Sequence, residues 1–297
     1  MASFFGSFPF SSIVRIALGI EYDGSAFSGW QWQDGPRSVQ ACVEAAVSKV
    51  ADHPASVICA GRTDTGVHAL EQVAHFDTDA KRELRGWLMG INTALPEDVR
   101  VLWAKPVDDR FHARYSAIAR FYRYVILNRP VRSALERRRV TWVYHPMDEA
   151  RMQLAAEHLI GEHDFSAYRA LGCQSKSPRR RMYFIHVYRR EDRVIVDISA
   201  NAFLHHMVRN IVGVLIAVGI GKQEPEWAKA VLESRDRSQG GVTAPPDGLY
   251  FGGVAYPAEF GLARHPVLDR LPADACRYTG DPADSVLHEL AGEEVVE

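Results

Sequence analysis

The 297-residue sequence predicts an α+β protein with two halves, each an antiparallel sheet with its helices on one face. Two observations support this prediction. Segments that alternate apolar and polar residues, typical of strands, are interleaved with segments of helical periodicity, and this series starts again near residue 115. Hydrophobic residues make up 47% of the chain, which is enough for a sizeable core. We expect the two sheets to join into one extended surface, with the helices on the other face.

The first half, residues 14–114, has the element order β-α-β-β-α-β of ferredoxin-like folds. It opens with a strand in which every second residue is apolar, ended by a Tyr-Asp-Gly turn. A helix then follows Ser38, a residue type that caps helix N-termini. In chain order, the predicted elements are a strand (14–24), a helix (38–50), a buried strand (56–61), a strand (73–78), a helix ended by Pro96 (82–95) and a strand (99–107).

The second half, residues 115–257, repeats the mixture of strands and helices. Its first strand would place Tyr122 and Tyr124 on one face, because side chains two apart in a strand point the same way. Two later strands read as a hairpin with an acidic turn. In chain order, the predicted elements are a strand (120–128), a helix capped by Asp148 (148–160), a hairpin (181–190 and 193–200), a helix capped by Asn201 (201–221), a helix (226–234) and a strand (248–256).

Both ends of the sequence differ from these halves. Residues 1–13 resemble neither a secretory signal nor a transit peptide, and we expect a flexible tail there. Residues 258–297 hold nine acidic residues and three arginines, which predicts an acidic C-terminal extension outside the core. The longest strongly apolar run, residues 211–220, is far short of the roughly 20 residues that span a bilayer, so we expect a cytoplasmic protein without a membrane segment.

The cysteines and histidines give no metal pattern. No Cys-x-x-Cys pair is present, which argues against a disulfide scaffold or a zinc site and fits a reducing cytoplasm. His205 and His206 are adjacent, and on the predicted helix they would point in different directions. We therefore expect no metal site. The four cysteines are Cys42, Cys59, Cys173 and Cys276.

Two basic segments predict that the protein binds a polyanion. Residues 110–140 contain nine arginines and one acidic residue, interleaved with Phe and Tyr, and residues 176–181 read KSPRRR. A merely solvated surface usually mixes both signs of charge, whereas one sign dominates here. Nucleic acid is the commonest polyanion that such segments bind. The candidate contacts to an RNA backbone are Arg114, Arg120, Lys176, Arg179, Arg180 and Arg181.

The stretch CAGRTDTGVHAL, residues 59–70, places Arg62 and Asp64 in a loop flanked by glycines. Glycines allow a tight turn and the close approach of another chain. The spacing is not that of a phosphate-binding P-loop, because no Gly-Lys-Ser/Thr follows. The two residues could form a surface salt bridge worth about 0–1 kcal/mol, or Asp64 could be catalytic. From the residues alone, a catalytic Asp64 and a structural turn aspartate stay equally open.

Six blocks, in this order and at this spacing, resemble the tRNA pseudouridine synthase A family. The resemblance extends over residues 14–257 and does not include the acidic extension. An ordered set of this kind is far more specific than any one motif. The blocks are YDGSAFSGWQWQ (22–33), AGRTDTGVHA (60–69), FHARYSAIARFYRYVILN (111–128), DFSAYRA (164–170), NAFLHHMVRNIVG (201–213) and DGLYF (247–251).

The resemblance implies a reaction and a substrate. Members of this family convert uridine to pseudouridine at positions 38 to 40, in the anticodon arm of tRNAs. The N1–C1′ bond breaks, the uracil turns, and C5 bonds to C1′. The reaction is redox-neutral and releases nothing, so no cofactor is implied. The family acts as a homodimer with one tRNA spanning both subunits.

The resemblance also implies roles for particular residues. Asp64 matches the essential aspartate, which could attack C1′, attack C6 or remove the C2′ proton; the sequence does not choose among these. Arg209 matches its counter-ion. Tyr122 matches the tyrosine that stacks on the target base, although strand patterning alone favours a core tyrosine. Leu249 matches an apolar residue of the base pocket, and core packing explains a leucine equally well.

Two further residues of the loop are candidates for binding the substrate. Arg62 would contact the RNA or fill the space left when the target base leaves its stack, a step that costs a few kcal/mol. His68 would either contact phosphate or fix the loop, and we favour the second role. Arg62 and Asp64 then act separately rather than as a pair.

Two other classes of function compete with this prediction. A non-catalytic tRNA-binding or chaperone module on the same scaffold would be indicated if Asp64, Tyr122 or Arg209 were replaced, and all three are present. A glycoside or nucleoside hydrolase would need a second acidic residue beside Asp64, where the motif supplies arginine. We therefore favour an active isomerase.

Overall fold

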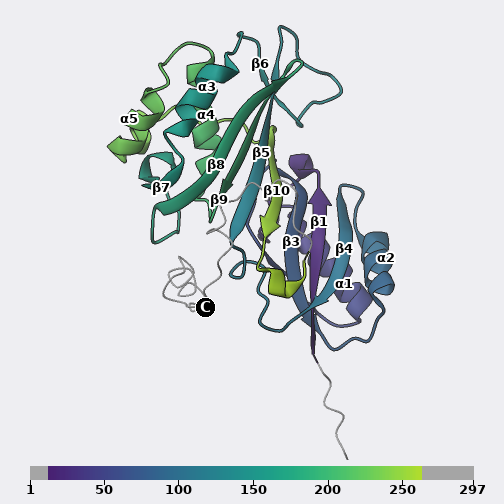
Figure 1. The fold of residues 1–297 in the computed structure, drawn as a ribbon. Helices are drawn as coiled ribbons and strands as arrows, with labels where there is room; N and C mark the ends of the chain where they lie inside the picture. Colours follow the sequence, from purple (N-terminus) through teal and green to yellow (C-terminus); the bar gives the residue numbers. More distant parts are fainter. Residues whose placement is uncertain (1–12, 263–297) are drawn as a thin grey trace, which may run out of the picture.

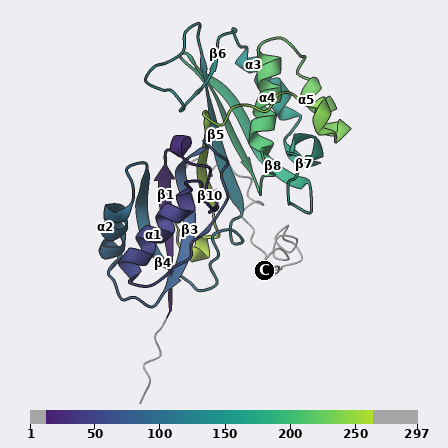
Figure 2. The same ribbon diagram turned by 180° about the vertical axis from the view of Figure 1, so that it is seen from behind.

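The structure is a computed structural model that describes residues 13–262. The predicted flexible tail, except for Ile13, and residues 263–297 of the predicted acidic extension lie outside the described residues. One mixed sheet runs through the described part, and five α-helices lie on one of its faces (Figures 1 and 2). None of these helices, within residues 13–262, is long and apolar enough to cross a membrane. The predicted α+β class is confirmed.

The strands of the sheet follow the order β4-β1-β3-β10-β5-β9-β8-β7, with β2 paired to β3 and β6 paired to β5. The strands are β1 (Val14–Tyr22), β2 (Ile58–Cys59), β3 (His68–Thr78), β4 (Val99–Val107), β5 (Ala119–Asn128), β6 (Thr141–Val143), β7 (Gly161–Asp164), β8 (Arg179–Arg190), β9 (Arg193–Ala200) and β10 (Leu249–Ala255). The helices are α1 (Val39–Ala51), α2 (Leu84–Ala94), α3 (Glu149–Glu157), α4 (Met207–Gly219) and α5 (Trp227–Ser234).

The first half has the predicted order β1-α1-β2-β3-α2-β4. Strand β1 lies between β3 and β4 and is antiparallel to both. The predicted cap is present, because the Ser38 hydroxyl accepts a hydrogen bond from the Ala41 amide at 3.4 Å. Helices α1 and α2 pack on each other and on this part of the sheet (Figure 2). Local sequence patterns were therefore enough to predict the order of the elements in this half.

Strand β10 joins the two halves into one sheet. It is antiparallel to β5, which precedes it by more than 120 residues, and parallel to β3, where Tyr250 is opposite His68. The predicted single extended surface is therefore made by the last described strand, which lies between the strands of both halves (Figure 1). Helices α3, α4 and α5 cover the second half on the same face as α1 and α2.

Two predicted element boundaries are wrong by five residues or more. The helix expected to begin after Asn201 begins at Met207, because His206 has a left-handed backbone (φ 59°) that a helix cannot include. The strand expected over residues 73–78 begins at His68. Two of its first five residues, His68 and Gln72, are polar but buried, and their side chains bond to backbone groups of neighbouring segments. Hydrophobic patterning does not detect a strand of that kind.

Candidate active site

A cavity of about 930 Å³ lies between the loop that carries Asp64 and the start of α4. Its floor includes Tyr122 of β5 and Leu249 of β10, the strands that join the halves. Arg62 and Arg209 also line it. Residues from both halves of the chain therefore meet around one carboxylate.

The loop between β2 and β3 is held rigidly at the residue before Asp64. The Thr63 carbonyl accepts a hydrogen bond from the Trp30 amide at 3.0 Å, and the Thr63 hydroxyl lies 2.7 Å from that of Tyr22. Gly29 makes this approach possible: its φ is +93°, and a Cβ there would lie 2.5 Å from the Thr63 oxygen. These bonds fix the backbone from which the Asp64 side chain enters the cavity.

Arg209 of α4 is the cation beside Asp64. Its Nη1 lies 3.2 Å from Asp64 Oδ2, while its Nε donates to the Ala244 carbonyl at 2.8 Å. The two side chains are 14% and 23% exposed, so water screens their interaction less than on an open surface. The second bond fixes the plane of the guanidinium, which then orients the carboxylate and offsets its charge.

His205 and His206 complete the surroundings of the carboxylate, and the prediction that they diverge is wrong. Their Nε2 atoms lie 3.5 Å and 3.3 Å from Asp64 Oδ1 and Oδ2. The left-handed conformation of His206, before the helix, turns both rings to the same side. Burial lowers the pKa of His206, so this ring is neutral at pH 7. Periodicity gave no signal for these residues, because it placed them inside a helix.

Asp64, His205 and His206 also form a group of three residues of metal-ligand types. The ligand atoms of Asp64, His205 and His206 lie within 4.8 Å of one another, a group of three that metals accept. The Arg209 guanidinium beside Asp64 Oδ2 repels a second cation. We therefore assign the two histidines to the carboxylate rather than to a metal.

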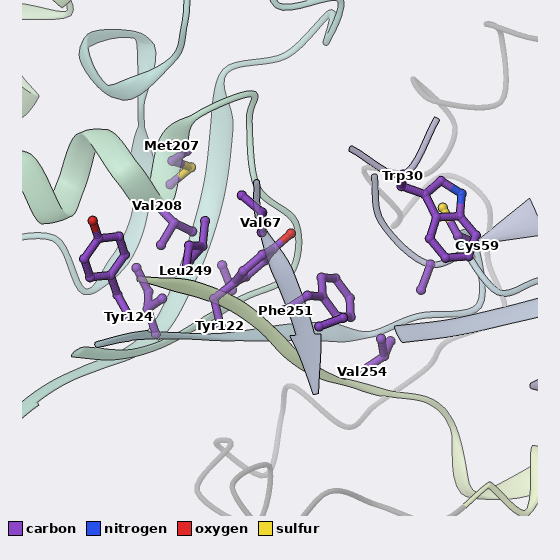
Figure 3. Packing of buried hydrophobic residues seen from close by; sticks show 14 of the residues in the cluster. Trp30, Cys59, Val67, Tyr122, Tyr124, Met207, Val208, Leu249, Phe251 and Val254 are labelled. Atoms are coloured by element: carbon purple, nitrogen blue, oxygen red, sulfur yellow. The ribbon is translucent and has the colours of Figure 1, made fainter. Parts of the chain in front are cut away.

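Tyr122 and Leu249 form the apolar floor. Figure 3 shows the side chains of Tyr122, Tyr124 and Leu249 on the same side of their strands, the side on which Val208 of α4 lies. The Tyr122 ring meets Phe203 and Phe251 edge-on, each at a centroid distance of 5.0 Å. Burial raises the pKa of Tyr122 well above its usual value, so the phenol is neutral. A neutral aromatic ring held in this way is suited to stack on a planar base.

Arg62 and His68 occupy very different surroundings. Arg62 is exposed at the cavity, and within residues 13–262 it forms no ion pair with Asp64. His68 is 2% exposed; the Gly24 amide donates to its Nδ1 at 3.1 Å, and its Nε2 lies 2.8 Å from the Arg138 carbonyl. Arg62 is therefore accessible to a substrate, whereas His68 ties the loop to neighbouring segments.

The six basic candidates divide into accessible and buried residues. Lys176 and Arg179 are exposed, and Arg114 and Arg181 are half-buried. Arg120 is 7% exposed and donates to the Asn201 and Ala60 carbonyls at 2.7 and 3.2 Å. Arg180 is 2% exposed. It donates to the Ser177 carbonyl at 2.9 Å and the Ser175 hydroxyl at 2.7 Å. These two arginines hold the fold, and only the other four have accessible charge.

The fold and the site together define a class of protein. A carboxylate oriented by an arginine, above an aromatic and apolar floor and beside accessible cations, is suited to covalent or acid–base chemistry on a base of a nucleic acid.

Comparison with known proteins identifies the family. A family model described as tRNA pseudouridine synthase matches residues 19–116 and 155–257. Curated relatives called tRNA pseudouridine synthase A include one from Methylococcus capsulatus, 65% identical over 90% of this chain and 99% of the relative. Those from Nitrosococcus oceani and Coxiella burnetii are 57% and 55% identical over 84% and 86% of this chain, and 97% and 98% of each relative. The chain belongs to the tRNA pseudouridine synthase family.

Proposed function

We propose that this member of the family isomerises uridine to pseudouridine at positions 38 to 40 of the anticodon arm of tRNA. The observation that carries the proposal is the pairing of Asp64 with Arg209 across the two halves, 3.2 Å apart in a cavity open to solvent. A tRNA-binding module without chemistry would not need a carboxylate in that place, because a carboxylate repels phosphate.

The target uridine leaves its helix before it reacts, since a stacked base cannot reach Asp64. Arg62 is accessible at the cavity and contacts the RNA during this step. The uracil then lies on the Tyr122 ring against Leu249. The N1–C1′ bond breaks and the C5–C1′ bond forms; the C5 proton goes to solvent and N1 gains one. Asp64 acts at C1′, at C6 or on the C2′ proton, and Arg209 offsets its charge.

The tRNA is bound mainly through its backbone and shape. The accessible cations Arg114, Lys176, Arg179 and Arg181 contact phosphates, because the deep major groove of double-stranded RNA offers little sequence readout.

The protein works as a cytoplasmic homodimer with a tRNA across both subunits, as the resemblance implies. Its three described cysteines are free, which fits a reducing compartment. The division into domains 14–114 and 115–257 is part of this proposal.

The test measures tritium release from tRNA labelled at uridine C5. Wild type is compared with Asp64→Ala, and with Asp52→Asn as a matched control. Asp52 is an exposed carboxylate whose left-handed backbone (φ 62°) asparagine tolerates. We expect release by wild type and the control, and a loss of about 10⁴-fold or more in Asp64→Ala with tRNA affinity within a few-fold. Substrates with a single uridine among positions 38, 39 and 40 test the position.

Each other outcome has a clear meaning. No release by any variant, with tRNA still bound, supports the binding or chaperone alternative. Loss of binding together with activity in Asp64→Ala makes Asp64 a structural residue. Release from uridines outside positions 38 to 40 rejects the proposed target while retaining the reaction.

A further inference from the structure

We propose that Arg237 is a positioning residue that keeps the Arg209 guanidinium in its orientation beside Asp64. It does so by holding residues 240–246, the segment of chain against which Arg209 lies. The inference rests on the proposed function and deepens it, because Arg237 itself does not line the cavity.

The 240–246 segment contacts both sides of the site. Arg209 Nε donates to the Ala244 carbonyl at 2.8 Å, and the Ala244 amide donates to the Arg209 carbonyl at 3.1 Å. Pro246 lines the cavity, and a Cβ on Gly66, in the loop between β2 and β3, would lie 3.1 Å from the Pro246 ring. The position of this segment therefore sets where the guanidinium lies relative to the carboxylate on the opposite loop.

The 240–246 segment belongs to no helix or strand, so other contacts must hold it in place. One of these contacts is direct packing on α4. A Cβ on Gly213 of α4 would lie 1.9 Å from the Val242 carbonyl oxygen, so the two backbones meet without a side chain between them. This contact fixes the distance of the segment from the helix, but it does not fix the direction of the Ala244 carbonyl.

A hydrogen-bonded cluster around Asn210 supplies the second support. Asn210 of α4 is 2% exposed and its Nδ2 donates to the Tyr168 carbonyl at 2.7 Å. Its Oδ1 accepts from the Thr243 hydroxyl at 2.7 Å and from Arg237 Nη2 at 3.0 Å. Arg237 Nη2 also donates to Thr243 Oγ1 at 2.9 Å. The cluster joins α4 to the residue that directly precedes Ala244.

Arg237 provides the charge in this cluster. Within residues 13–262 it forms no ion pair with a carboxylate, and its Nη2 donates to two neutral oxygens instead. Hydrogen bonds from a charged donor are stronger than those between neutral groups. The backbone of Arg237 is fixed as well, because Asp236 Oδ1 accepts from the Ser238 amide at 2.9 Å at the start of this short turn. A half-buried guanidinium bonded inwards in this way suits a positioning role better than a phosphate contact.

The experiment uses the full-length protein with Arg237→Met, which keeps an apolar stem and removes the donors, and with Arg237→Lys and Thr243→Val. The matched control is Arg189→Met. Arg189 is also a half-buried arginine, and it donates to Asn128 Oδ1 at 3.3 Å and to the Met147 carbonyl at 2.7 Å, but it does not line the cavity. Single-turnover tritium release, the Kd for tRNA and urea unfolding are measured for each variant.

We expect the single-turnover rate to fall about tenfold in Arg237→Met with the Kd within twofold, as for a misplaced catalytic group. Arg237→Lys should keep more of the rate, and Thr243→Val should lose less than Arg237→Met. Arg189→Met should change the unfolding midpoint and not the rate. In the Arg209→Gln background, Arg237→Met should cause no further loss, because the residue that it positions is gone.

The Nε–H signal of Arg209 in nitrogen-15 NMR gives a readout that needs no tRNA. Its bond to Ala244 should protect this proton from exchange with water, and the signal is assigned by its loss in Arg209→Gln. We expect the protected signal to be lost in Arg237→Met and to remain in Arg189→Met.

Three results overturn the proposal: the losses in Arg237→Met and Arg209→Gln multiply in the double variant, the Kd rises while the rate is unchanged, or only stability changes. The second of these would make Arg237 an RNA contact. If Arg237→Met fails to fold, Arg237→Lys and Thr243→Val give the same comparison. The expected NMR change in a protein that releases no tritium would reject the proposed function and keep the positioning role.

Discussion

Arg62 and Arg209, two arginines that line the cavity with Asp64, come from different regions of the chain and differ in exposure and in their contact with the carboxylate. Arg62 is two residues from Asp64, yet it is exposed and makes no ion pair with it in the described part of the chain. Arg209, 145 residues away, is 14% exposed and lies against the carboxylate. The loop after β2 supplies the carboxylate proposed to react, and the start of α4 supplies the arginine that lies against it. The site therefore exists only where β10 joins the halves.

The largest effect should distinguish these two arginines. Arg209→Gln removes the charge beside Asp64 and the bond to Ala244, and we expect kcat to fall about 10²–10³-fold, as when one preorganised charge is lost from an active site. Arg62→Gln should mainly raise KM for tRNA, by about tenfold, because the role proposed for Arg62 is to contact RNA. Tritium release under single-turnover and steady-state conditions separates the two effects.

The matched control is Arg82→Gln, which removes an exposed arginine far from the cavity and should change neither constant. Equal losses of kcat in Arg62→Gln and Arg209→Gln would contradict the division of roles. So would a normal kcat in Arg209→Gln.

A smaller effect should distinguish accessible from buried arginines at the start of β8. Arg179→Glu combined with Arg181→Glu should weaken binding to all tRNAs alike, by about tenfold at low salt, and should reduce the salt dependence of the Kd. Arg180→Glu should instead lower stability, because its guanidinium is bonded to backbone and side-chain oxygens in the interior. Filter binding at several salt concentrations and urea unfolding measure the two effects.

Two outcomes would contradict this division. A loss confined to one tRNA would contradict recognition by shape and backbone. Normal stability in Arg180→Glu would mean that the interior tolerates the lost bonds.

The elements could be predicted from the sequence wherever local rules decide them. Ser38 and Asp148 cap helices as expected, since capping depends on neighbouring backbone amides only. The start of α4 could not be predicted. Asn201 and the residues after it fit a helical pattern, but the left-handed backbone of His206 prevents the helix from beginning before Met207. Tertiary packing overrides the local pattern there. The position of β10 between β3 and β5 is likewise set by contacts between residues that are distant in the sequence.

The site could be predicted only in part and for the same reason. The resemblance led to Asp64 and Arg209, and the structure brings them together. The approach of His205 and His206 to Asp64 depends on the boundary that periodicity misplaced. Charge counting grouped Arg180 with its neighbours, although alternation along β8 buries one side chain and exposes the next. Sequence gives the charge of a segment but not which charges water reaches.

The smallest effect concerns how the two regions are kept together. His75 on β3 is 2% exposed, and its Nδ1 accepts a bond from the Ala113 amide in the segment that leads into the second half. Burial lowers its pKa from 6.5 to about 3. Above pH 6.5 both folded and unfolded chains hold a neutral ring, so the stability is fully present. Below it the unfolded chain binds a proton that the folded chain does not, and the stability falls.

This difference in protonation predicts a loss of about 1 kcal/mol in the free energy of unfolding for each pH unit between 6.5 and about 3. Urea unfolding at pH 7.0 and 5.5 should show the loss in wild type and less of it in His75→Gln, which retains an acceptor for Ala113 and does not titrate. Tritium release should fall with the folded fraction in both proteins. An equal pH dependence in the two proteins would show that other groups govern the junction, and that the two regions stay together without a neutral His75.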